Sequence, residues 1–232
     1  MNDYNEAFFD AIRDGCIKSA AKVVPCVMAI VKPGSVIDVG CGEGWWLRTF
    51  WECGVHYEEL LGIDNHSGLE KLKGWDGAFI KRDIPTELAD PTNIGRRFDL
   101  AVCLEVAEHL DASQADALVE YLCGRSDVVL FSAAIPGQGG VGHVNEQWPE
   151  YWIQKFNQRG FIGNGNLRKT LWEDPDVENW YSQNLYVFAN MAQIDPQRRG
   201  GEYLRSWMVS RPEMPRRVIH PRLWAHHKGV SL

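Results

Sequence analysis

The sequence predicts an α/β fold in which a doubly wound parallel sheet carries helices on both of its faces. Short apolar runs alternate with segments of helical spacing, and short connections join them. A glycine-rich turn follows the first apolar run, Val36–Val39, and the second run, residues 60–64, ends in an acid. Folds of this class bind ligands beyond the carboxyl ends of their strands, where both features lie.

The elements follow from periodicity and from turn signals. Residues 3–31 have helical spacing, which Gly15 and Pro25 are expected to interrupt. The near-continuous apolar run over residues 98–104 indicates a strand buried on both faces. Further helices are predicted over residues 43–53, 67–73, 112–122 and 146–160, further strands over 78–80, 128–131 and 185–188, and loops over 85–97 and 132–145.

The length of 232 residues suits one sizeable core and a small appendage. We divide the chain into an N-terminal helical cap (1–34), a ligand-binding domain (35–191) and a basic C-terminal extension (192–232). The extension has eight Lys or Arg and three acids, a net charge of +5, so the rest carries −12 of the total of −7. The extension could hold an anionic substrate or partner, or dock on the body; docking is favoured because Trp207, Ile219 and Trp224 give it apolar surface to bury.

Bulk features narrow the functional class. The net charge of −7 argues mildly against a nucleic-acid partner without excluding one. The longest apolar run, residues 23–31, is too short to span a bilayer, and no signal peptide is recognisable, so no membrane association is expected. The six cysteines form no C-x-x-C pair, which suits reduced thiols in the cytoplasm. The sequence leaves monomer and homodimer open.

The turn after the first strand has glycines at positions 40, 42 and 44. Glycine lets a ligand approach the backbone, and the helix that follows points N–H groups at that ligand. Asp64 ends the second strand about 20 residues later, where an acid can accept hydrogen bonds from both hydroxyls of a ribose. A dinucleotide dehydrogenase more often shows G-x-G-x-x-G, whereas position 45 here is Trp.

This combination, with Asp38 inside the first strand, resembles the class I S-adenosylmethionine (SAM) methyltransferase family over residues 30–190. The resemblance implies a Rossmann-like SAM methyltransferase sheet with SAM as cofactor, and an N-terminal helix that covers the cofactor or simply packs on the core. In that family, an acid such as Asp83 accepts from the adenine amino group and the next backbone N–H, here of Ile84, meets a ring nitrogen. Asp83 could instead only cap the turn before Pro85. The implied cofactor-binding residues are Asp38, Gly40, Gly42, Gly44, Asp64, Asn65, Asp83 and Ile84.

A cluster of ligating side chains is expected beside the cofactor. If residues 105–109 are helical, Glu105, Glu108 and His109 lie on one helical face. His143 is in the loop after the next strand, which should rise beside residue 105. Two carboxylates suit Mg²⁺ or Mn²⁺, whereas two imidazoles lean towards Mn²⁺, Fe²⁺ or Zn²⁺.

The E-x-x-E-H stretch resembles that of the ubiquinone-biosynthesis O-methyltransferases and of the small-RNA terminal-ribose 2′-O-methyltransferases. The RNA enzymes bind a divalent cation with that Glu, Glu and His and a further His, and the cation grips two neighbouring hydroxyls. Three interpretations stay open: a metal site at Glu105, Glu108, His109 and His143, a metal-free base at His109 or His143, or no chemical role. The candidate catalytic residues are His109, His143 and Glu105.

The segment 142–148 is rich in His, Asn, Glu and Gln, which could line a polyhydroxylated substrate. Trp148, Tyr151 or Trp152 could offer an aromatic face to a sugar ring. We therefore expect a SAM-dependent methyltransferase (EC 2.1.1.-) that methylates a hydroxyl of a small-molecule or glycan acceptor, with Mg²⁺ or Mn²⁺ as a possible second cofactor. The alternatives are an RNA terminal-ribose 2′-O-methyltransferase and a non-catalytic SAM-binding regulatory protein.

Overall fold

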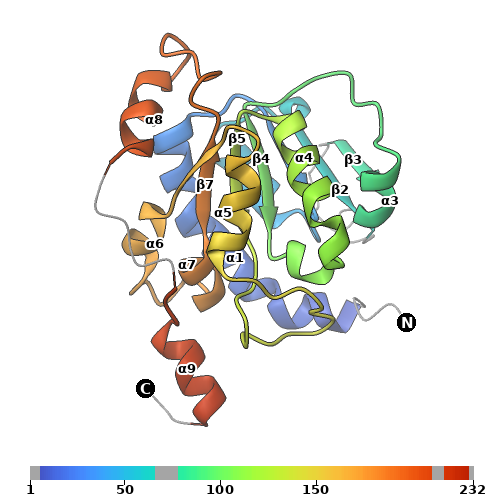
Figure 1. Ribbon diagram of the computed structural model, residues 1–232, viewed down its shortest axis with the longest axis vertical. Helices are drawn as coiled ribbons and strands as arrows, with labels where there is room; N and C mark the ends of the chain where they lie inside the picture. The colour runs from blue at the N-terminus through green and yellow to red at the C-terminus, as the bar shows by residue number, and fades with distance from the viewer. Residues whose placement is uncertain (1–5, 66–77, 211–216, 230–232) are drawn as a thin grey trace.

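The computed structural model describes residues 6–65, 78–210 and 217–229 (Figure 1). The predicted helix over residues 67–73 lies outside these ranges. The strands are β1 (Val36–Val39), β2 (Leu60–Asp64), β3 (Ala78–Lys81), β4 (Leu100–Leu104), β5 (Val128–Ser132), β6 (Ile162–Asn164) and β7 (Tyr186–Ala189). The α-helices are α1 (Glu6–Val31), α2 (Trp45–Glu52), α3 (Ile84–Ala89), α4 (Ala115–Arg125), α5 (Pro149–Asn157), α6 (Asn166–Leu171), α7 (Asn179–Asn184), α8 (Gly201–Met208) and α9 (Pro221–Lys228).

The strands form one sheet in the order β3-β2-β1-β4-β5-β7-β6. The first five strands in this order are parallel, as predicted, whereas β7 runs antiparallel to both β5 and β6. The strand order reverses between β1 and β4, whose carboxyl ends carry the glycine turn and the E-x-x-E-H stretch. The fold therefore places both motifs at the topological switch point, where such sheets bind ligands.

Side chains of alternate strand residues enter separate cores on the two faces of the sheet. Val36, Leu100 and Leu130 pack on one face with α1, α2, α6, α7 and α8. Ile37 and Phe131 pack on the other face with α4 and α5, which stand in front of the sheet in Figure 1. The sheet is thus covered on both faces, as predicted.

Helix α1 is continuous through Gly15 and Pro25, so the expected interruptions are wrong. Its residues Val23, Val24 and Val27 are fully buried, and this packing outweighs the poor helix propensity of glycine and proline. Gly15 also has a packing role, because a Cβ there would lie 2.2 Å from Oε1 of Glu178. Within the described segments, no helix combines the length and the apolar character needed to cross a bilayer.

Three other predictions need correction. Residues 84–89 form helix α3 inside the expected loop, because Asp83 accepts a hydrogen bond from the backbone N–H of Thr86 (3.0 Å) and Pro85 lies in the first turn. The stretch expected as a helix over 146–160 is helical only over Pro149–Asn157. Strand β6 was not predicted.

The C-terminal extension contributes α8, which contacts α1 and β6, and α9, which contacts α7. The large apolar side chains that it buries include Leu204 and Met208 of α8 and Leu223 of α9. The expectation for Ile219 and Trp224 is wrong, because they stay 48% and 50% exposed. Trp207 is only partly buried against the core.

Candidate functional site

The glycine turn is held against the end of β2 by hydrogen bonds that its backbone N–H groups donate. The N–H of Gly40 donates to the carbonyl oxygen of Ile63 (2.8 Å), and the N–H of Gly42 donates to Oδ2 of Asp64 (2.8 Å). Gly40 has φ 81°, and a Cβ there would lie 2.3 Å from Cγ2 of Val106. Both the backbone conformation and the close approach therefore require glycine at position 40.

Asp38 carries an unsatisfied polar atom beneath this turn. Its side chain is 2% exposed, and Oδ2 meets no hydrogen-bond partner among the described residues. Burial, followed by the charge of Asp64, holds the pKa of Asp38 well above its usual value. A buried acceptor without a donor is costly, so the site fits a ligand that brings an N–H or O–H group to Asp38.

Asn65, which follows β2, and Asp83 and Ile84 at the start of α3 line the same cavity as Asp38 and Asp64. The side chain of Asp83 caps α3, and hydrogen bonds from Thr86 lower its pKa. Capping leaves Asp83 on the cavity wall, so both interpretations of this residue are compatible with the fold. Its adenine contact stays a prediction. Gly44 lies outside the cavity wall, where it is the N-cap of α2 with φ 80°.

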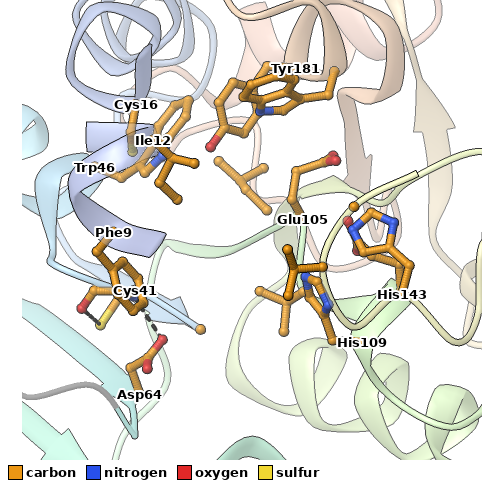
Figure 2. Close-up of a pocket in the computed structure, with 18 of the residues that line it drawn as sticks. Phe9, Ile12, Cys16, Cys41, Trp46, Asp64, Glu105, His109, His143 and Tyr181 are labelled. Atoms are coloured by element: carbon orange, nitrogen blue, oxygen red, sulfur yellow. Dashed lines mark hydrogen bonds between the residues drawn. The ribbon is translucent and has the colours of Figure 1, made fainter. Parts of the chain in front are cut away.

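Helix α1 lines the cavity beside the glycine turn with Phe9 and Ile12, which Figure 2 shows, and with Arg13. The Nε of Arg13 donates to Oε2 of Glu43 (2.8 Å), and Nε1 of Trp45 donates to the same oxygen (2.9 Å). Hydrogen bonding to Glu43 is the main reason that the pKa of Arg13 is raised. The helix thus both packs on the core and borders the cofactor end of the cavity.

We expect Arg13→Gln to lower the free energy of unfolding by about 1–3 kcal/mol, because it leaves the buried carboxylate of Glu43 without its cation. The control is Arg48→Gln, which breaks a more exposed pair with Glu52 and should change stability by less than about 0.5 kcal/mol. Urea denaturation of both variants measures the difference. Equal losses of unfolding free energy in the two variants would mean that the ion pair between Arg13 and Glu43 does not stabilise the packing of α1.

Residues from the ranges 104–110 and 138–143 line the other end of the cavity, here named the acceptor end, and three ligating side chains come together there. One ligand atom from each of Glu108, His109 and His143 lies within 4.8 Å of the others. Figure 2 shows the two imidazoles side by side, and their ring centroids are 4.8 Å apart. The predicted approach of the loop after β5 is confirmed, because the N–H groups of Val144 and Asn145 both donate to the carbonyl oxygen of Glu108 (2.9 and 3.0 Å).

Glu105 does not share a helical face with these residues, so that part of the prediction is wrong. It has φ 53°, a left-handed conformation rare for a side chain of this size, and the short 3₁₀ helix covers only Ala107–His109. Its carboxylate accepts from Nε2 of Gln138 (2.9 Å) and Nδ2 of Asn184 (3.2 Å). Strain at a cavity-lining residue, held by two amides, is typical of a functional position.

The electrostatics of the cluster favour an added cation. Both carboxylate oxygens of Glu108 are buried without a hydrogen-bond partner among the described residues. Burial and then the charge of Glu105 raise the pKa of Glu108. Burial and then the charge of His143 lower the pKa of His109 to about 4, although carbonyl groups of Gly142 and Glu105 act in the opposite direction. His109 is therefore uncharged near neutral pH, as a metal ligand must be.

His143 is oriented by a carboxylate. Its Nδ1 lies 2.9 Å from Oε1 of Glu146, and Glu146 also accepts from the N–H groups of Gly137 and Gly139 (2.7 and 2.8 Å). Burial raises the pKa of Glu146, but these hydrogen bonds outweigh it and the pKa is lowered overall. A charged Glu146 fixes the proton of His143 on Nδ1 and leaves Nε2 as the electron-pair donor, the arrangement common around metal-bound histidines.

Both ends belong to one cavity of about 1290 Å³. Its aromatic wall comes from Trp45, Trp46, Trp180 and Tyr181, and Trp46 meets Tyr181 edge to face at 5.0 Å. The expected aromatic wall is wrong: its members Trp148, Tyr151 and Trp152 lie outside the cavity lining, as do Asn145, Glu146 and Gln147. Trp152 instead packs on Phe131 (5.2 Å) in the core.

Comparison with known proteins agrees with this arrangement. Residues 17–123 match the methyltransferase domain family, and a search of curated proteins finds no match. The sugar N-methyltransferase KedS8 from Streptoalloteichus sp ATCC 53650 shares 17% identity at a TM-score of 0.58, over 80% of this chain and 92% of its own.

Two further solved structures have the same fold. The methyltransferase domain of bacterial CtHen1-C shares 19% identity at a TM-score of 0.57, over 75% of this chain and 98% of its own. SAM-bound CalS10, an amino pentose methyltransferase from Micromonospora echinaspora, shares 17% identity at a TM-score of 0.55, over 82% of this chain and 99% of its own. The chain therefore has the Rossmann-like fold of the SAM-dependent methyltransferases, and its residues 17–123 match the methyltransferase domain family.

Proposed function

We propose that the chain methylates a hydroxyl group of a small-molecule or sugar-like acceptor, with a divalent cation held by Glu108, His109 and His143. The observation that carries this proposal is the position of that cluster in the same cavity as the glycine turn. The orphaned carboxylate of Glu108 and the donor set of one carboxylate and two imidazoles fit Mn²⁺, Fe²⁺ or Zn²⁺. The names of KedS8, a sugar N-methyltransferase, and CalS10, an amino pentose methyltransferase, support a sugar-like acceptor; the choice of a hydroxyl rests on the Glu108, His109 and His143 cluster.

The residues of the chain would hold the two reactants in line. Asp38, Asp64 and the glycine turn bind the cofactor, which supplies an activated methyl group, and α1 covers this end against water. A cation at the cluster would bind acceptor hydroxyls and lower their pKa. In the metal-free alternative, Nε2 of His143 would instead accept the hydroxyl proton, and Glu146 would stabilise the imidazolium that results. Glu105 accepts hydrogen bonds from two side-chain amides, which hold a polar group at the cavity wall beside the acceptor.

The test is transfer of the labelled methyl group of SAM to a panel that pairs diols with single hydroxyls. Catechol should react faster than phenol, and a ribonucleoside faster than its 2′-deoxy analogue. EDTA should abolish the transfer and Mn²⁺ should restore it. Transfer that survives EDTA, or that is equal for diols and single hydroxyls, would contradict the metal-assisted reaction and leave a histidine base.

The terminal ribose of RNA is a second candidate acceptor. The E-x-x-E-H stretch and the basic residues after position 191 favour it, whereas the net charge of −12 on the rest of the chain disfavours it. Binding of an RNA oligonucleotide that weakens steeply with salt would support it. A non-catalytic SAM-binding role is disfavoured by the dense polar acceptor end of the cavity.

A further inference from the structure

Helix α9 forms part of the cavity wall, although it lies far along the chain from every motif. Arg222, Leu223 and His227 all line the cavity. Cε1 of His227 would lie 3.9 Å from a Cβ at Gly139, which places this helix beside the loop that carries His143. The basic extension therefore contributes side chains to the acceptor end.

The start of α9 is fixed by buried contacts. The backbone N–H of His220 donates to Oε1 of Gln183 (2.7 Å), and Nε2 of Gln183 meets Oδ1 of Asn184 (3.1 Å). Asn184 in turn donates to Glu105. Because His220, Gln183 and Asn184 are at most 4% exposed, α9 and the carboxylate of Glu105 are held in one rigid network.

Arg222 brings a positive charge to this wall without a carboxylate to neutralise it. Its Nη2 donates to the carbonyl oxygens of Asp174 and Val177 (3.2 and 2.8 Å). Among the described residues, no acid forms an ion pair with it. Two carbonyl groups orient the guanidinium but leave its full charge, and its planar fork suits a carboxylate or phosphate.

We propose that Arg222 binds an anionic group, a carboxylate or a phosphate, on the methyl acceptor. The proposal rests on the proposed function, because it takes the cavity as an acceptor site. The carboxylates of Glu105 and Glu108 would repel such an anionic group. Attraction by Arg222 and repulsion by these two carboxylates would together orient the acceptor in the cavity. The acceptor is then a hydroxyl compound with one acidic substituent, and Arg222 is a specificity-determining residue.

The test compares acidic and neutral members of matched pairs in the presence of S-adenosylhomocysteine and Mn²⁺. The pairs are 3,4-dihydroxybenzoate with catechol, and ribose 5-phosphate with ribose; they separate a carboxylate from a phosphate. Calorimetry should show that at least one acid binds about tenfold more tightly than its neutral partner. Arg222→Gln, which keeps a donor for the carbonyls, should reduce the ratio to about twofold, and Arg222→Lys should keep part of it.

Lys228→Gln is the matched control, because it removes one charge from the same helix at an exposed residue outside the cavity lining. It should leave the ratio unchanged, and thermal melting checks that each variant is folded. Equal affinities within both pairs, absence of binding by both acids, or a preference that survives Arg222→Gln would overturn the proposal. Neutral diols that bind and react without such a preference would leave the proposed function intact, whereas loss of methyl transfer to every member would refute that function.

Discussion

Glu108→Gln is expected to lower the affinity for Mn²⁺ by more than about 100-fold, because loss of a direct ligand should exceed the 10–100-fold effect of changing a residue that only orients a ligand. Glu146→Gln changes such an orienting residue beside His143, so its effect should fall inside that 10–100-fold range. Glu150→Gln is the control, because Glu150 pairs with Arg217 outside the cavity lining. Mn²⁺ titrations of the three variants give the comparison.

The same substitution should leave the metal-free protein as stable as before, or more stable. The raised pKa of Glu108 favours the uncharged carboxylic acid, which glutamine resembles in size and charge. If the role of Glu108 were structural, its replacement would instead lower the free energy of unfolding of the protein. Urea denaturation in EDTA separates the two cases. Unchanged Mn²⁺ affinity together with easier unfolding of Glu108→Gln would contradict a ligand role.

Asp64→Asn is expected to weaken binding of S-adenosylhomocysteine by about 10- to 100-fold, since hydrogen bonds to a charged acceptor are worth about 1.5–3 kcal/mol. The carboxylate lies in the cavity and also accepts from the N–H of Gly42 (2.8 Å), so the substitution affects both the ligand contact and the glycine turn. Asp99→Asn is the matched control: Asp99 accepts from the N–H of Gly34 (2.7 Å) outside the cavity lining. Calorimetry should show normal affinity for Asp99→Asn, and equal losses in both variants would contradict the cofactor role of Asp64.

The cofactor end could be predicted from sequence because its signals are local. The glycines, Asp38 and Asp64 lie in or directly after short apolar strands, and parallel strands end at the same edge of a sheet. The same argument brought His143 beside His109, since β4 and β5 are neighbours. Hydrophobic pattern and sheet topology were sufficient for these positions.

The residues that orient Glu105 could not be predicted, because they depend on long-range pairing. Asn184 reaches Glu105 only because β7 inserts antiparallel beside β5, which nothing in the local pattern of residues 185–188 indicates. The positive φ of Glu105 is equally hidden, since a left-handed conformation is normally signalled by glycine.

The aromatic residues that line the cavity lie in another segment than the sequence predicts, for a physical reason. Trp152 and Phe156 recur at helical spacing in α5, and that spacing marks the face that packs on the sheet. Trp180 and Tyr181 lie in a short helix without such periodicity, and only the tertiary fold brings them to the cavity. Arg222 belongs to the same class, because its position depends on how the C-terminal extension docks.

The central claim is that the cofactor and a divalent cation bind in one cavity. Titration of the unaltered protein with Mn²⁺ in the presence of S-adenosylhomocysteine, followed by electron paramagnetic resonance, tests it most directly. We predict one Mn²⁺ per chain with a dissociation constant in the micromolar range, and loss of that binding in His109→Ala and His143→Ala. Only weak, non-stoichiometric Mn²⁺ binding, unchanged by either substitution, would contradict the claim.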